Sequence, residues 1–184
     1  PVPVPICAAL PEGVPMSAES AKNPKHLPGA RSAALRLFRR WGNSGFGRWL
    51  CSRAICFQAP YFSSISPLLE LLEPGHAIAS IKQRRSVQNH IGTVHAIALC
   101  NLAEFVGGLA TDAAVTAEQR WIPKGMTVRY LKKALGPMRA EAQLDNIGEL
   151  SEGAEKIARV VIKDRQNETV FSADISMWVS PKRG

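Results

Sequence analysis

One stretch near the middle of the chain constrains the fold more than any other. Residues 95–110 are apolar almost all round, and only Asn101 and Glu104 are polar between Ala96 and Leu109. A helix that is apolar on every side must be enclosed by other elements of the fold. No apolar run in the chain reaches the roughly 18 residues of a membrane-spanning helix, so we do not expect an integral membrane protein.

The segments around this run are typical of β-strands, because their side chains alternate between apolar and polar or are rich in Val and Ile. The order is two strands, one apolar helix and four further strands. Short turns between the last four strands make them antiparallel neighbours. We therefore predict an α+β fold in which a curled antiparallel sheet wraps around one central apolar helix. Five of these six strands are expected over residues 76–87, 126–133, 138–145, 155–163 and 171–179.

The N-terminal part of the sequence differs in composition from the rest. Five prolines fall in the first 15 positions, so residues 1–30 are expected to be a disordered tail. Met16 starts a segment that resembles an ordinary translation start, and we expect residues 1–15 not to belong to the native product. No charged segment precedes a continuous apolar stretch, so a secretory signal is not expected.

A helical arm is predicted over residues 31–60. Ser32 can cap a first helix that has Leu35, Phe38 and Trp41 on one face, and a second helix is expected over residues 46–57. An Arg-rich amphipathic helix near an N-terminus could be a mitochondrial presequence. A structural helix with its arginines directed to solvent is the interpretation that we prefer.

Length and charge limit the function. A chain of 184 residues has the size of one domain, and its formal net charge of +8 is unevenly distributed. Residues 121–140 carry five basic and no acidic side chains, which suits any polyanion. Tyr130 is the only aromatic residue within 122–140, so the aromatic platform of a nucleic-acid binder is not expected. The four cysteines have no zinc-ligand spacing; we predict no metal site, and reduced thiols in an intracellular protein.

Polar residues gather just before the apolar helix, in the segment 89–95. Gly92 allows close approach of the backbone, Thr93 can cap the helix, and the free N–H groups of a helix start favour an anionic oxygen. Glu104 is the unusual residue on the helix itself, because a buried carboxylate must be paired or shift its pKa. It either has a chemical role or faces solvent at a gap in the sheet. Glu104 lies nine residues after His95, about 13 Å along the helix axis, so one subunit cannot readily bring them together.

Asn89-x-x-x-Thr93-x-His95, followed by an acidic residue nine positions later on an apolar helix, resembles the hotdog-fold acyl-CoA thioesterases, in particular their phenylacetate-pathway-like subgroup. The stretch from Met126 to Gly136 is similar to that family's third strand and the turn after it. The resemblance covers roughly residues 61–181, the hotdog domain is expected over residues 61–184, and the arm is similar to a less characterised branch. It implies a homodimer or a dimer of dimers, an acyl-CoA substrate, no cofactor beyond the CoA of the substrate, fatty acid metabolism, and a cytoplasmic location, with a mitochondrial one as the alternative.

The resemblance also implies roles for individual residues. Glu104 would activate water as a general base or attack directly, and Asn89 would place the thioester or the water from the partner subunit. His95 would hold the thioester carbonyl and order the helix start, and the N–H of Ala96 would donate to the oxyanion. Candidates for holding the phosphates of CoA are Arg84, Arg85, Lys124, Arg129, Lys132 and Lys133.

Two departures from the subgroup leave the chemistry open. Ala96 and Ile97 stand where the subgroup has two glycines, and the hydroxyl usually found near the start of the third strand appears only at Thr127. A thioesterase is the first hypothesis. A non-catalytic hotdog module that binds an acyl-CoA or a lipid is the alternative, and a hotdog hydratase is weaker because the Pro-Gly-rich loop of those enzymes is missing before the helix.

Overall fold

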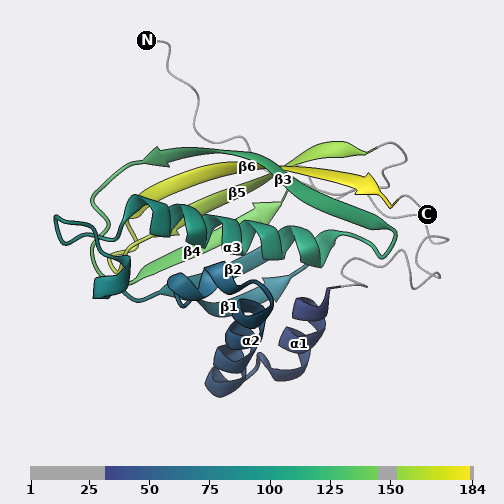
Figure 1. Cartoon of the computed structure of the whole chain (residues 1–184), viewed down its shortest axis with the longest axis horizontal. Helices are drawn as coiled ribbons and strands as arrows, with labels where there is room; N and C mark the ends of the chain where they lie inside the picture. The colour runs from purple at the N-terminus through teal and green to yellow at the C-terminus, as the bar shows by residue number, and fades with distance from the viewer. Residues whose placement is uncertain (1–31, 145–152, 183–184) are drawn as a thin grey trace, which may run out of the picture.

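Alternating apolar side chains produce a six-stranded sheet in which every neighbouring pair is antiparallel. The computed structural model describes residues 32–144 and 153–182. The strand order is β1-β2-β4-β5-β6-β3, which leaves β1 and β3 at the two edges (Figure 1). The strands are β1 (Leu68–Glu73), β2 (His76–Ile81), β3 (Gln119–Tyr130), β4 (Met138–Leu144), β5 (Ala154–Lys163) and β6 (Thr169–Pro181).

The helix α3 (Ala96–Ala114) lies along one face of this curved sheet (Figure 1). Leu102, Phe105 and Val106 are almost fully buried against the strands. Gly107 allows the close approach, because a Cβ there would lie 2.8 Å from Cδ1 of Ile175 on β6. By length and composition α3 alone among the described helices could cross a membrane, but here most of it is core. The predicted fold, a curled antiparallel sheet around one central apolar helix, is confirmed.

The N-terminal arm consists of α1 (Ala33–Trp41) and α2 (Gly45–Gln58). As expected, Ser32 caps α1: its Oγ accepts a hydrogen bond from the backbone N–H of Leu35 at 3.0 Å. Leu35, Cys51 and Ile55 are buried in the same core as α3, while the far ends of both helices project away from the sheet (Figure 1). A short 3-10 helix, η3 (Pro60–Ser64), leads into β1.

Several predicted boundaries move. The strand expected over residues 76–87 ends at Ile81, because the following residues form a loop with a 3-10 turn, η4 (Arg85–Val87). β3 begins at Gln119 rather than at residue 126. The alternation of Val128 and Tyr130 with Arg129 predicts a core position for Tyr130, but Tyr130 is 52% exposed because β3 is an edge strand. The expected tail over residues 1–30 and the start at Met16 lie outside the described residues.

Candidate functional site

The loop before α3 is held by one amide side chain. Oδ1 of Asn89 accepts hydrogen bonds from the backbone N–H groups of Ile91 (3.1 Å) and Thr93 (3.0 Å), and Nδ2 of Asn89 donates to Oγ1 of Thr93 at 2.7 Å. Gly92 has a φ of +77°, a left-handed conformation that glycine adopts without strain. An added Cβ at Gly92 would meet nothing within 4 Å, so its role here is the turn and not the close approach that the sequence suggested.

The cap of α3 is His95, not Thr93 as predicted. Nδ1 of His95 accepts a hydrogen bond from the backbone N–H of Ile97 at 3.1 Å, whereas the hydroxyl of Thr93 is engaged by Asn89. The Thr93 position is too early because the chain is still extended there, and Val94 forms a β-bridge with Gln88. Ala96 is the first helical residue, and a backbone N–H at this position has no acceptor within its own helix.

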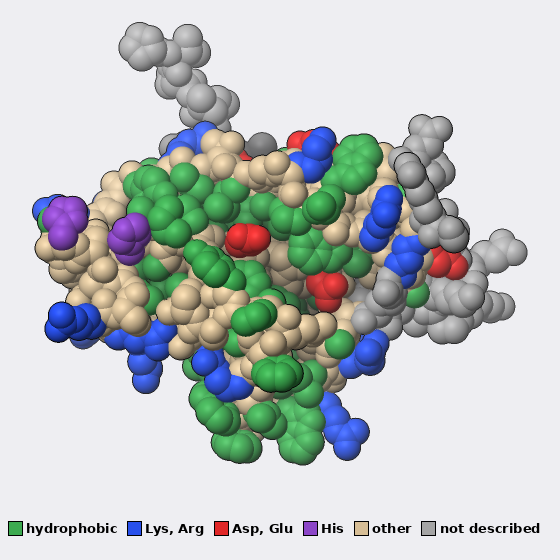
Figure 2. Space-filling view, in the orientation of Figure 1, with side chains coloured by type: hydrophobic (Ala, Val, Ile, Leu, Met, Phe, Trp, Pro, Cys, Tyr) green, Lys and Arg blue, Asp and Glu red, His purple; other side chains and the backbone are tan. Residues whose placement is uncertain are grey.

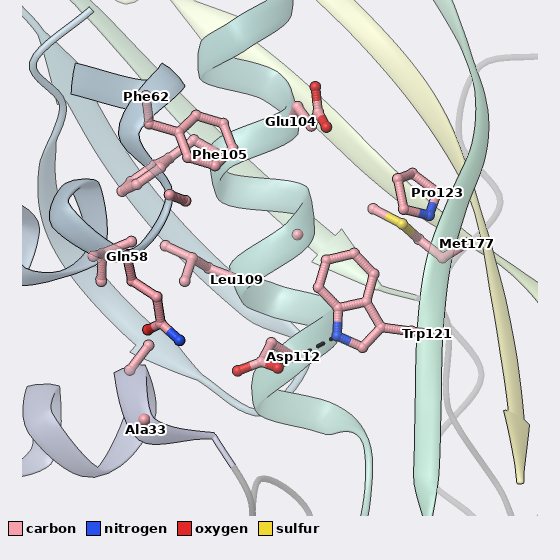
Figure 3. A pocket seen from close by; sticks show the side chains of 14 residues that line it. Ala33, Gln58, Phe62, Glu104, Phe105, Leu109, Asp112, Trp121, Pro123 and Met177 are labelled. Atoms are coloured by element: carbon pink, nitrogen blue, oxygen red, sulfur yellow. Dashed lines mark hydrogen bonds between the residues drawn. The ribbon is translucent and has the colours of Figure 1, made fainter. Parts of the chain in front are cut away.

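Glu104 is exposed at the rim of a cleft of about 460 Å³ between α3, β3 and the arm (Figure 3). Its carboxylate has no hydrogen bond or salt bridge within the described part of the chain. Phe62, Phe105 and Leu109 make the cleft largely apolar, with Gly108 leaving it room beside Trp121. Glu104 therefore faces a gap that the sheet does not cover.

The far end of this cleft is closed by a polar contact. Nε1 of Trp121 donates to Oδ1 of Asp112 at 3.3 Å, which links β3 to the last turns of α3 (Figure 3). The other wall is formed by the arm, with Ala33 and Ala34 of α1 and Ile55 and Gln58 of α2. Sequence reasoning missed the arm as part of this cleft, because an amphipathic pattern shows that a helix packs but not against what.

His95 lies on a second, smaller pocket of about 190 Å³, which Glu104 does not line. One chain thus keeps the two predicted catalytic groups apart, as their spacing on the helix indicated. This pocket also contains Asn101, which is 5% exposed. Its Nδ2 donates to Oγ of Ser64 at 3.1 Å, and its Oδ1 has no partner within the described residues. Asn101 is the second polar group that the sequence singled out on the helix.

The predicted phosphate-binding side chains do not form one cluster. The segment after β3 contacts the loop before α3, since the N–H of Val94 donates to the carbonyl of Ala134 at 2.9 Å. Arg84, Arg85, Lys132 and Lys133 belong to these two neighbouring segments, while Lys124 lies six residues before the end of β3, ~20 Å along the strand.

Three of these cations already have partners. Nη2 of Arg84 donates to the carbonyl of Ser64 at 3.0 Å, and Lys124 lies 3.8 Å from a carboxylate oxygen of Glu155. Lys132 pairs with Glu168, whose carboxylate raises the pKa of the lysine. Arg129, Arg85 and Lys133 are exposed.

An apolar surface runs along α3 and the open edge of the sheet. We call it the β3 face; Figure 2 shows hydrophobic side chains gathered over this part of the molecule. Between 51% and 56% of each large residue on it is exposed: Ile97, Tyr130, Leu131 and Leu135. A long unpaired edge strand with exposed apolar side chains is a ready partner for another chain.

Tyr130 connects this face to α3. Its hydroxyl lies 3.3 Å from Sγ of Cys100, and its ring packs edge-on against Phe171 with centroids 5.5 Å apart. The hydrogen bond to Cys100 and partial burial raise the pKa of Tyr130 to about 12. The hydroxyl is therefore a neutral group on this face.

Solved structures share the fold. A structural-genomics crystal structure, APC5556, is 41% identical and covers 81% of this chain and 98% of its own, with a TM-score of 0.70. PA5026 from Pseudomonas aeruginosa, described as a probable thioesterase, is 28% identical and covers 69% of this chain and 91% of its own, with a TM-score of 0.63. The thioesterase HI1161 from Haemophilus influenzae is 16% identical over 66% of this chain and 82% of its own, with a TM-score of 0.59.

No curated protein matches the chain. The model of a protein family does match it, over residues 47–179, and that family is described as a domain of unknown function, DUF4442. The matched range contains most of α2, the whole of α3 and β3, and nearly all of the sheet. The chain therefore belongs to the DUF4442 family and has the hotdog fold of the thioesterase-family structures that it resembles.

Proposed function

We propose that the protein is a thioesterase that hydrolyses an acyl-CoA at a site shared by two subunits. The observation that carries the proposal is the position of Glu104, a carboxylate without a partner in the described residues at the mouth of an apolar cleft. A cleft of about 460 Å³ lies within the range of about 300–1,000 Å³ that ligand pockets occupy. Its apolar lining suits an acyl chain, and the exposed carboxylate suits the bond to be hydrolysed.

The second subunit is required by the distance between the two parts of the site. His95 and the N–H of Ala96 lie about 13 Å from Glu104 along the helix, and His95 lines a different pocket. If two β3 faces packed together around a twofold axis, the helix start of one subunit could approach Glu104 of the other. The exposed Ile97 and Tyr130 support such an interface, since it would bury them.

The chemistry then follows from the groups present. Glu104 takes a proton from a water molecule, and the hydroxide attacks the carbonyl carbon of the thioester. The oxyanion of the tetrahedral intermediate accepts a hydrogen bond from the partner's helix start, where the dipole of α3 also favours negative charge. The carbon–sulfur bond then breaks, and the thiolate leaves with the proton returned by Glu104. Asn89 keeps the loop before α3 in place and orients the substrate.

Binding of the leaving group is assigned to Arg129, Lys133 and Arg85, which are exposed, with Arg84 and Lys132 beside them. Arg and Lys both bind phosphates, and the diphosphate of CoA is the group that they would recognise. The same arrangement could accept the phosphopantetheine of a carrier protein.

A non-catalytic acyl-CoA or lipid-binding module is the second candidate. The observation that favours it is Ile97, which is 56% exposed where the thioesterase subgroup has glycine, so a bulky side chain stands beside the helix start. In this alternative the protein binds an acyl-CoA in the cleft but releases no thiol.

Release of free thiol from a panel of acyl-CoA substrates separates the two candidates. We expect turnover by the natural chain and a loss of ~10²–10⁴ in kcat for Glu104→Gln, because a positioned general base contributes that much. Glu73→Gln, at an exposed carboxylate that ends the opposite edge strand, is the matched control and should retain full activity. Tight binding of acyl-CoA without thiol release would favour the binding module.

A further inference from the structure

The helix α2 is apolar on two opposite sides, and only one of them faces the protein. Gly47, Cys51 and Ile55 are buried on the inner side. Phe46, Trp49, Leu50 and Phe57 follow one another at helical spacing on the outer side, where 71%, 51%, 37% and 91% of each residue is exposed. A helix that is apolar on both sides normally contacts a second apolar environment.

Three exposed aromatic residues gather at the end of the arm that is farthest from the sheet, while Phe57 lies at the other end of α2. Trp41, which ends α1, is 47% exposed, and the rings of Phe46 and Trp49 stack with their centroids 5.8 Å apart. We call Trp41, Phe46, Trp49 and Leu50 the arm tip. Figure 1 shows the connection between α1 and α2 at this end, and Figure 2 shows hydrophobic side chains covering it. Scattered exposed apolar residues are normal, but a contiguous patch marks an interaction site.

The charge around the arm tip is of one sign. Residues 32–60 contain five arginines and no Asp or Glu. Arg39 and Arg40 are exposed in the last turn of α1, and the guanidinium of Arg40 lies 5.8 Å from the ring centroid of Trp41. Two arm tips brought together would place these cations side by side, which disfavours a second copy of the chain as the occupant.

Tryptophan and arginine side by side match the chemistry of a membrane surface. The indole ring of Trp is apolar with one polar N–H, and this residue prefers the boundary between headgroups and acyl chains. Arginine extends an apolar stem and binds phosphate oxygens with its planar guanidinium. A helix with an exposed apolar side and flanking cations lies in this boundary when the lipids are anionic.

We propose that the arm tip docks on a lipid bilayer that contains anionic phospholipid. Trp41, Phe46 and Trp49 enter the headgroup boundary, and Arg39 and Arg40 bind lipid phosphates. The proposal does not depend on thioesterase activity. It has a consequence for the cleft, because the inner sides of α1 and α2 form one of the cleft walls, so docking would hold the cleft close to the lipid.

Vesicle flotation with the full chain tests the proposal. We expect the chain to float with vesicles of phosphatidylcholine and phosphatidylglycerol, to bind vesicles of phosphatidylcholine alone at least tenfold more weakly, and to dissociate as salt rises. The double variant Phe46→Ser/Trp49→Ser should lose at least tenfold in partitioning, and Val161→Ser, at an exposed apolar residue on β5, should not. Arg39→Glu/Arg40→Glu should lose the preference for anionic vesicles, whereas Arg165→Glu, in the exposed turn before β6, should retain it.

A second measurement does not rely on polar substitutions. Lipids brominated on their acyl chains should quench the tryptophan fluorescence of the natural chain, and the conservative variant Trp41→Phe/Trp49→Phe should still float but lose most of the quenching. Absence of flotation with anionic vesicles, or quenching that persists in that variant, would overturn the proposal. A third result would also overturn it. If the natural chain bound no vesicles and Phe46→Ser/Trp49→Ser changed the sedimenting mass, the arm tip would be assigned to a protein contact.

Discussion

The two ends of the candidate site differ in how far a single chain completes them. Before α3, Asn89 makes three hydrogen bonds within its own loop and His95 caps the helix. Glu104, nine residues later, has no polar partner in the described chain and stands beside exposed apolar surface. The fold of one chain holds Asn89 and His95 in place. Glu104 has the features of a residue that contacts a substrate or a second subunit. Substitutions at the two ends should therefore fail in different ways.

The largest difference is expected in stability. Asn89→Ala removes three hydrogen bonds and should lower the free energy of unfolding by about 1–3 kcal/mol, together with activity. Glu104→Gln should leave the free energy of unfolding within about 0.5 kcal/mol of the natural chain, since the side chain is exposed. Denaturant unfolding measures both, with Gln88→Ala as the neighbouring control. Equal destabilisation by Asn89→Ala and Gln88→Ala would contradict the description of this loop.

A smaller effect should separate long substrates from short ones at the Glu104 end. A Cβ added at Gly108 would lie 3.2 Å from Cη2 of Trp121, so Gly108→Leu should fill part of the cleft. We expect kcat/KM for long-chain acyl-CoA to fall ~10-fold or more, within the range that a few methylene groups contribute, with little change for the shortest substrate. Gly45→Leu is the control, because a Cβ at Gly45 meets nothing within 4 Å. An equal loss for all chain lengths would place the acyl chain elsewhere.

The smallest effect concerns the link between α3 and β3. Cys100→Ala removes the hydrogen bond to the hydroxyl of Tyr130, so the pKa of Tyr130 should fall from about 12 toward 10. Absorbance of tyrosinate measures this shift, and Tyr61, the other of the two tyrosines, is an internal reference. In the natural chain the raised pKa means that this group's contribution to stability is intact below about pH 10 and is lost as the pH rises through the raised value. An unchanged titration would place Tyr130 away from Cys100.

The sequence predicts the fold well for helices and strands that bury a clearly defined side in the core. The alternation in β4 and β6 and the apolar run of α3 each record which side of an element faces the core, and these elements appear where expected. The start of β3 was missed because most of Gln119–Tyr130 is exposed, and an edge strand has no clear alternation to detect. The strand predicted over residues 76–87 is too long, because the loop residues after Ile81 continue the alternation of apolar and polar side chains.

The site was only partly predictable, for a related reason. Glu104 was found because it interrupts an apolar helix, whereas Asn89 and His95 were found through the motif that resembles the hotdog thioesterases. The structure shows where the three residues lie without testing what they do. Thr93 was assigned the cap that His95 provides, since both side chains can accept a hydrogen bond and only the backbone path decides between them. The cleft wall from Ala33 to Gln58 was invisible in the sequence, because it depends on how the arm packs against α3.

Mixing two inactive chains tests the shared site most directly. Glu104→Gln and Asn89→Ala chains, unfolded together and refolded in equal amounts, should form mixed dimers in which one of the two sites has both natural residues. Random pairing in a symmetric dimer predicts recovery of about a quarter of the natural activity, while each variant refolded alone stays inactive. A mixture as inactive as its components, in a preparation where tagged subunits prove that mixed dimers formed, would contradict a site shared between subunits.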